Sequence, residues 1–197
     1  MKATYKGFEA KKSGGFIDLP PVGAYVAEIQ DVRFVEGEDG KRDRIECMME
    51  ITEGEFKGRY HEVFNDQQER FGKATYKGVF RLVCPQDEED VVKRSFEGNL
   101  WCVQESNPGY TWDWNEKKLK GKKVGISIRK RLYTYNGKDR ETVEIARFET
   151  VDDVRNGKCK PVRDRDMRES KEEEPVETPS TDGSGFTEVS SEVSVPW

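Results

Sequence analysis

The clearest pattern of apolar and polar positions lies in residues 122–151, where two alternating segments are joined by Asn136-Gly137-Lys138-Asp139. Asn-Gly between alternating segments predicts a β-hairpin, because both residues tolerate positive φ. Successive side chains alternate across a strand. The first arm therefore presents one apolar face with Val124, Ile126, Ile128 and Leu132. Its opposite face carries Lys123, Gly125, Ser127, Arg129, Arg131, Tyr133 and Tyr135.

Three more strands are predicted upstream of this hairpin. Residues 24–35 form a long first strand, followed by a turn at 37–40. Residues 44–52 alternate most regularly and turn Ile45, Cys47, Met49 and Ile51 inward. Residues 58–65 are predicted as the third strand, with Tyr60 and Phe64 on one face and Arg59 on the other.

The segment between the third strand and the hairpin has a mixed pattern. Asp66 is a helix-capping residue, and the apolar positions from Phe71 to Val83 recur at roughly helical spacing. A second short helix is predicted from Asp87 to about Phe96, then a short strand at 98–103. An irregular loop follows at 106–115, with Tyr110, Trp112 and Trp114.

This order of elements predicts a mainly β protein. Three strands, a helical segment and a hairpin give a five-stranded OB-fold barrel with a helical insertion between strands 3 and 4. A general β-sandwich with helical insertions is the alternative. The predicted domains are an N-terminal arm (1–19), the OB-fold domain (20–157), a basic linker (158–168) and a disordered acidic tail (169–197).

Charge is distributed unevenly along this polar chain, in which 34% of residues are hydrophobic and 37% are charged. Residues 169–197 hold eight acids and one base, which leaves 31 acids and 33 bases in residues 1–168. This asymmetry favours a nucleic-acid-binding body with an acidic interaction tail, although a neutral domain with a solubilising tail fits too. The tail is too polar to bury a core. Its apolar tip, Val195-Pro196-Trp197, is predicted to bind a partner protein, with a random C-terminus as the alternative.

Cations that hold phosphates and rings that stack on bases are what a single nucleic-acid strand requires. Both kinds of side chain occur on the polar face of the hairpin. The predicted single-stranded DNA-binding residues are Lys123, Arg129, Arg131, Tyr133, Tyr135, Trp112, Trp114, Tyr110, Arg59, Tyr60 and Arg147. The loop aromatics also fit a plug over one end of the barrel, and a solvated outer face is the alternative for the hairpin.

Catalytic and metal-binding motifs are absent from the sequence. It has one His, no Gly-rich phosphate loop, no GxSxG and no HExxH, so no enzyme activity and no cofactor are predicted. The four cysteines have no CxxC spacing and are predicted to be reduced thiols, and nothing in their spacing supports a zinc site with His61. No apolar run approaches about 18 residues, and residues 1–5 lack a signal-peptide core, which predicts a cytoplasmic protein.

Three stretches resemble phage and prophage single-stranded DNA-binding proteins: 21–25 (PVGAY), 51–59 (ITEGEFKGR) and 119–124 (LKGKKV). The acidic tail is similar to that of bacterial single-stranded DNA-binding proteins, which usually ends in Pro-Phe, whereas this sequence ends in Pro-Trp with sparse acids near the tip. The resemblance covers about residues 20–151 and the tip.

The resemblance implies an OB-fold that binds single strands without sequence preference in phage DNA replication or recombination, in the cytoplasm of an infected bacterial cell. The tail would recruit replication or recombination proteins. A protein-interaction module without DNA affinity and a metal-dependent nuclease are the alternatives. DNA against RNA preference, homo-oligomer formation and binding-site size stay open.

Overall fold

The computed structural model describes residues 17–38 and 40–168 of the chain. In this part of the chain the strands are β1 (Gly23–Val35), β2 (Arg44–Ile51), β3 (Val79–Val83), β4 (Lys123–Tyr135), β5 (Lys138–Glu149) and β6 (Arg165–Met167). The helices are α1 (Arg59–Phe71), α2 (Lys93–Ser106), the 3-10 helix η1 (Glu116–Leu119) and α3 (Val151–Arg155). The described chain is therefore mainly β, as predicted.

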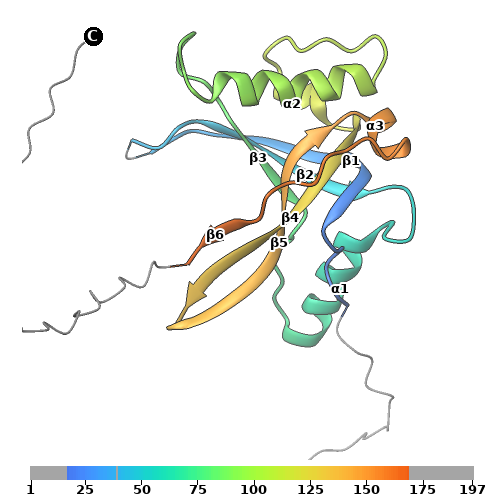
Figure 1. The fold of residues 1–197 in the computed structure, drawn as a ribbon, viewed down its shortest axis with the longest axis vertical. Helices are drawn as coiled ribbons and strands as arrows, with labels where there is room; N and C mark the ends of the chain where they lie inside the picture. Colours follow the sequence, from blue (N-terminus) through green and yellow to red (C-terminus); the bar gives the residue numbers. More distant parts are fainter. Residues whose placement is uncertain (1–16, 39, 169–197) are drawn as a thin grey trace, which may run out of the picture.

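All strands join one sheet in the order β3-β2-β1-β4-β5, with β6 added beside β4 (Figure 1). The first half of β4 pairs antiparallel with β1, and its outer half pairs in parallel with β6. At the two ends of this order, β3 and β5 lie side by side, and the rings of Phe80 and Phe148 stand 4.5 Å apart. The described backbones of β3 and β5 do not pair, so the sheet is open and the predicted barrel is not closed.

The predicted hairpin is confirmed as β4 and β5. Asn136 and Gly137 have φ values of 51° and 69°, as expected for a two-residue turn in which both residues need positive φ. The first two predicted strands are confirmed as β1 and β2. The predicted inward face of β2 and the first apolar residues of β4 form the core, in which Met49, Ile126 and Ile128 are almost completely buried. Leu132, predicted on the same face of β4, is only partly buried and lies outside this core.

The predicted third strand at 58–65 is wrong, because this segment begins α1. The Glu50 carboxylate on β2 accepts hydrogen bonds from the backbone N–H groups of Tyr60 (3.1 Å) and His61 (2.8 Å). These bonds satisfy donors that a helix start leaves free. Tyr60 and Val63, three residues apart, are both buried, which is helical spacing, whereas a strand would place them on opposite faces.

The structure also differs from the predictions downstream of α1. Val79–Val83, predicted as the end of a helix, forms β3 against β2. Residues 98–103, predicted as a strand, lie inside α2, which buries Phe96, Leu100 and Val103 at helical spacing. Residues 165–167, predicted as part of a linker, form β6. The predicted tail, with its apolar tip, lies outside the described residues.

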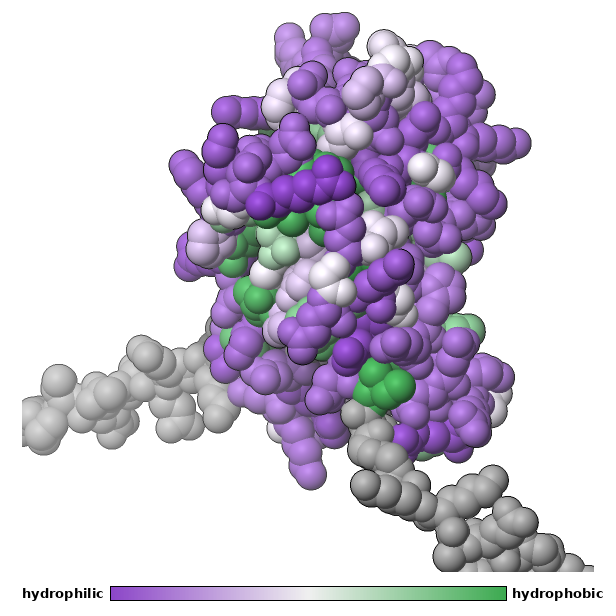
Figure 2. All heavy atoms as spheres, turned by 90° about the vertical axis from the view of Figure 1, so that its right-hand side faces the viewer, coloured by the Kyte–Doolittle hydropathy of each residue, from purple (hydrophilic) through white to green (hydrophobic). Residues whose placement is uncertain are grey.

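The surface is predominantly polar. Figure 2 shows the side of the domain that lies on the right of Figure 1, which is mostly hydrophilic with small apolar patches. The large charged fraction of the sequence accounts for this appearance. Within residues 17–38 and 40–168, no helix has both the length and the apolar character needed to cross a membrane.

Gly78 is required where β3 begins. A Cβ added there would lie 2.5 Å from the Met49 carbonyl oxygen and 2.7 Å from the Tyr60 ring. Gly78→Ala should therefore lower the free energy of unfolding by about 1–3 kcal/mol, measured by urea denaturation. The matched control is Gly98→Ala in α2, where an added Cβ meets nothing within 4 Å and helix propensity favours Ala by about 1 kcal/mol. Equal effects of the two substitutions would contradict this packing.

Candidate nucleic-acid interface

A groove of about 390 Å³ lies where the sheet is open, between β3 with its preceding loop and the β4–β5–β6 edge. We call it the basic groove. Its charged lining consists of Lys77, Arg81, Arg129, Arg131, Arg165 and Glu144. Uncharged residues complete it: Thr75, Tyr76, Val79, Phe80, Thr142, Val143, Ile145 and Ala146. Five cations thus face one carboxylate, so the groove has a strong excess of positive charge.

One carboxylate organises the β4 side of the basic groove. Glu144 accepts hydrogen bonds from Arg129 Nε (2.9 Å) and Nη2 (2.7 Å). The guanidinium groups of Arg165 and Arg131 lie 3.7 and 3.9 Å from the same carboxylate. Arg131 Nε is buried and has no hydrogen-bond partner among the described residues. Three arginines therefore share a single negative charge.

A second carboxylate has the same arrangement on the neighbouring strands. Glu46, on β2, is buried and accepts hydrogen bonds from Arg33 (2.8 Å), Arg44 (3.0 Å) and Arg81 (3.0 Å), each through Nε. Arg33 and Arg81 stand directly across from Glu46 on β1 and β3. Burial alone would raise the pKa of Glu46, but the three guanidinium groups outweigh it and lower the pKa to about 2. Glu46 thus stays ionised.

Arg81 connects the two clusters, because it both binds Glu46 and lines the basic groove. A strip of guanidinium groups therefore runs from β1 across β2 and β3 to β4 and β6. Guanidinium groups form paired, charge-assisted hydrogen bonds with phosphate oxygens. Such a strip is suited to a chain of phosphates.

Aromatic rings accompany the cations. Tyr76 lines the groove and is held in place by its hydroxyl group, which donates to the Met49 carbonyl oxygen (2.8 Å). Burial and the nearby Glu50 raise the pKa of Tyr76, so its ring remains neutral. The Arg131 guanidinium lies 5.6 Å from the centre of the Tyr133 ring, and Tyr135 at the hairpin end is 58% exposed. These rings offer surfaces for base stacking.

The structure brings only part of the predicted site together. Arg129, Arg131, Tyr133 and Tyr135 follow one another along the outer half of β4. Lys123 lies at the opposite end of β4, where its backbone N–H donates to Asn107 Oδ1. Arg147 is occupied by Glu149 (2.7 Å) and the Lys160 carbonyl oxygen (3.1 Å).

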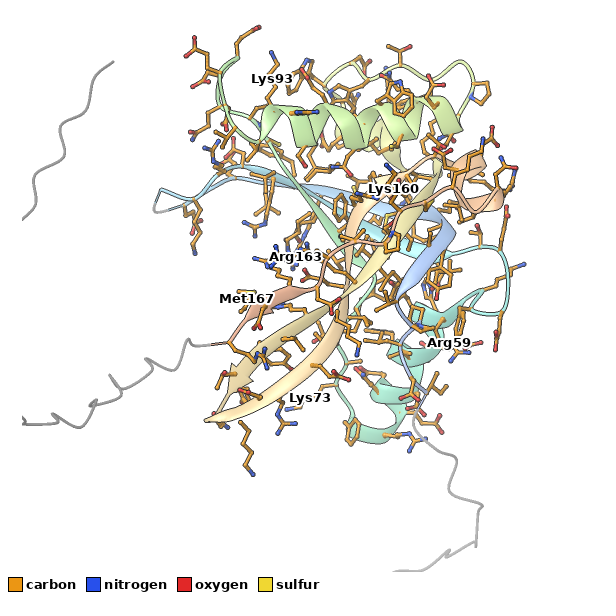
Figure 3. All side chains as sticks on the ribbon, viewed as in Figure 1. Arg59, Lys73, Lys93, Lys160, Arg163 and Met167 are labelled. Carbon is orange, nitrogen blue, oxygen red and sulfur yellow. The ribbon has the colours of Figure 1, made fainter. Side chains whose placement is uncertain are left out.

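The remaining predicted residues lie elsewhere. Arg59 and Tyr60 belong to α1, and Figure 3 shows Arg59 on the side of the domain away from the hairpin tip. Tyr60 is 3% exposed and therefore has no free ring face for a base. Tyr110, Trp112 and Trp114 come from the loop after α2; the first two pack partly against the core, while Trp114 is exposed. Val195, Pro196 and Trp197 lie outside the described residues.

Sequence reasoning missed several cations of the strip: Arg33, Arg44, Lys77, Arg81 and Arg165. The polar faces of the first two predicted strands contained a signal for Arg33 and Arg44. Lys77 and Arg81 were missed because residues 71–83 were interpreted as a helix. Arg165 reaches the groove only because β6 pairs with β4, which no local pattern indicates.

Comparison with known proteins does not assign this chain to a protein family. Neither a protein-family model nor a curated protein sequence matches this chain. Among the residues that the structure describes, no three His, Cys, Asp or Glu side chains gather in a way that would hold a metal ion. Function is therefore inferred from the geometry of the basic groove.

The Glu46 cluster gives a pH-dependent stability. The folded-state pKa of about 2 lies below the ordinary value of 4.5, so ionised Glu46 stabilises the fold above pH 4.5, and this contribution is lost as the pH falls toward 2. Glu46→Gln should cost about 1–3 kcal/mol of unfolding free energy at pH 6, and less at pH 3. Denaturant unfolding at both pH values measures the difference. A cost independent of pH would contradict the assigned role.

Proposed function

We propose that this protein binds single-stranded DNA without sequence preference, through the basic groove and the adjoining guanidinium strip. The observation that carries the proposal is the excess of five cations over one carboxylate in the groove, with Tyr76, Tyr133 and Tyr135 nearby. Phosphate contacts and base stacking both ignore base identity. Such a surface therefore suits any single strand.

The arrangement of strands supports an OB-fold for this function. Neighbouring strands follow the order β3-β2-β1-β4-β5, β3 and β5 lie side by side, and α2 joins β3 to β4. OB-folds are partly open barrels that bind oligonucleotides on the face of strands 2 and 3 and at the loops after strands 1 and 4. The Glu46 cluster crosses β2 and β3, and the hairpin with Tyr135 follows β4.

We infer that the protein acts in DNA replication or recombination of a phage, because residues 20–151 and the tip resemble phage and bacterial single-stranded DNA-binding proteins. The acidic tail would recruit replication or recombination proteins, and its tip Val195-Pro196-Trp197 would make the contact. No catalytic step is part of this proposal, since the cations and rings hold a strand without changing it.

The first test is a titration of the full chain with fluorescent oligo-dT, oligo-dA and duplex DNA at two salt concentrations. We expect tight, salt-sensitive binding that is similar for the two single strands and weak for the duplex. Arg131→Ala should weaken binding at low salt and reduce the slope of log K against log salt by about 0.7, the value for one phosphate contact on a single strand.

The matched control for Arg131→Ala is Arg94→Ala, which removes an exposed arginine of α2 that does not line the basic groove. It should leave both affinity and salt slope unchanged. If wild-type protein binds no oligonucleotide at low salt, or if the two variants weaken binding equally, the proposed site is wrong.

Substitution of Glu144 should strengthen DNA binding, in contrast to substitution of Arg131. Glu144→Gln removes the negative charge that Arg129, Arg131 and Arg165 share, so more positive charge is available to phosphates. We expect several-fold tighter binding of oligo-dT at low salt and a steeper salt dependence. The control is Glu53→Gln, whose partner Arg155 lies on α3 (2.6 Å). Weaker binding by Glu144→Gln would contradict this prediction, because it would mean that the ordering of the arginines by the carboxylate outweighs the effect of its negative charge.

A further inference from the structure

A second groove, of about 520 Å³, lies along α2 and is lined by aromatic side chains. We call it the aromatic groove. Trp101 of α2 is 53% exposed and Trp114 is 70% exposed. The Trp114 ring stacks on Phe96 with 5.8 Å between ring centres and 21° between planes. Trp112, Leu100 and Pro85 complete the apolar lining.

The outer rings of this groove lie outside the buried core. Trp112 packs against the core and fixes the loop, whereas Trp101 and Trp114 project beyond it. Exposed apolar surface of this kind marks an interaction site. Tryptophan side chains are also among the residues that most often anchor protein–protein interfaces.

The rim of the aromatic groove is acidic. Asp87, Glu88 and Glu97 line it, against the single cation Lys93. Lys93 is itself engaged, with its Nζ 3.2 Å from Glu88 and 3.9 Å from Glu97. This charge repels phosphates, so the aromatic groove is no extension of the basic groove. It favours a segment that combines apolar anchors with lysines.

The chain itself contains such a segment outside the described residues. Residues 1–16 have four lysines, one glutamate and the aromatic anchors Tyr5 and Phe8. Residues 169–197, the other long segment outside the structure, have eight acids and one base. Charge complementarity with the acidic rim therefore selects the N-terminal segment over the tail.

Geometry favours a groove on a neighbouring copy. The described chain begins beside α1, where the Asp18 carbonyl oxygen accepts from Arg59 (3.3 Å), and Figures 1 and 3 show α2 with Lys93 at the other end of the domain. A fully extended chain from Ile17 reaches at most about 32 Å to Phe8 and 43 Å to Tyr5. To reach the groove of its own copy the segment would have to cross the domain, whereas the groove of an adjacent copy imposes no such requirement.

We propose that residues 1–12 of one copy bind the aromatic groove of a neighbouring copy. Tyr5 and Phe8 provide the apolar anchors, and the lysines at 2, 6, 11 and 12 pair with the acidic rim. Such a contact joins two different surfaces, so successive copies line up head to tail and extend beyond a dimer.

The test is sedimentation velocity of the full chain over a concentration series, without nucleic acid. We expect concentration-dependent association that high salt weakens. Trp101→Ala should weaken it about tenfold or more. The matched control is Phe34→Ala, which removes a similarly exposed ring (46%) on β1 outside the groove and should have no effect.

A charge swap identifies the occupant. Lys6→Glu with Lys11→Glu should abolish association, as should Glu88→Lys with Glu97→Lys, and mixing the two variants should restore it between unlike copies. Circular dichroism checks that each variant is folded. A monomer at every concentration would overturn the proposal, including the case in which the segment occupies its own groove. Association that survives removal of residues 1–16 would overturn it too. Because nucleic acid is absent, these results are independent of DNA binding.

Discussion

The length of β4 is the constraint from which the shape of the basic groove follows. β4 has thirteen residues, but β1 pairs only with Lys123–Ile128, so its outer half needs other partners. β5 supplies one along one edge and β6 the other. Backbone pairing with β5 and β6 keeps the outer half extended and orders Arg129, Arg131 and Tyr133 on it. The protruding hairpin is thus a consequence of strand pairing.

Ion pairs hold in place the arginine side chains that the sheet brings together. Arginines of like charge repel one another, and a shared carboxylate offsets part of that repulsion while leaving the cluster positive. Glu46 and Glu144 each serve three guanidinium groups in this way. The arginines are therefore ordered before any ligand arrives, which reduces the entropy lost on binding. This pre-organisation distinguishes the basic groove from an ordinary solvated face with scattered lysines.

Local patterns predicted the elements that local forces determine. The strands β1 and β2 and the two arms of the hairpin follow from the alternation of apolar and polar residues. The hairpin turn follows from Asn136 and Gly137, because the positive φ that it needs is required only at these two residues. α1 and β3 were mispredicted because their decisive contacts are distant: Glu50 accepts from the start of α1, and Gly78 fits against Met49 and Tyr60. Two of the five cations of the basic groove were predictable for the same reason. Arg129 and Arg131 share a strand, whereas Arg81 and Arg165 join them only through tertiary pairing.

The domain separates charge along its length, with an acidic aromatic groove on α2 and a basic groove beside the hairpin. The sequence outside the described residues is separated in the same way, into a basic segment at 1–16 and an acidic one at 169–197. Opposite charges would attract each segment to one of the two grooves. On the two proposals made above, the basic segment would join copies, while the acidic tail would compete with DNA for the basic groove. A bound strand would then displace the tail and leave its tip accessible to partners, so that DNA binding and partner recruitment would be coupled through charge.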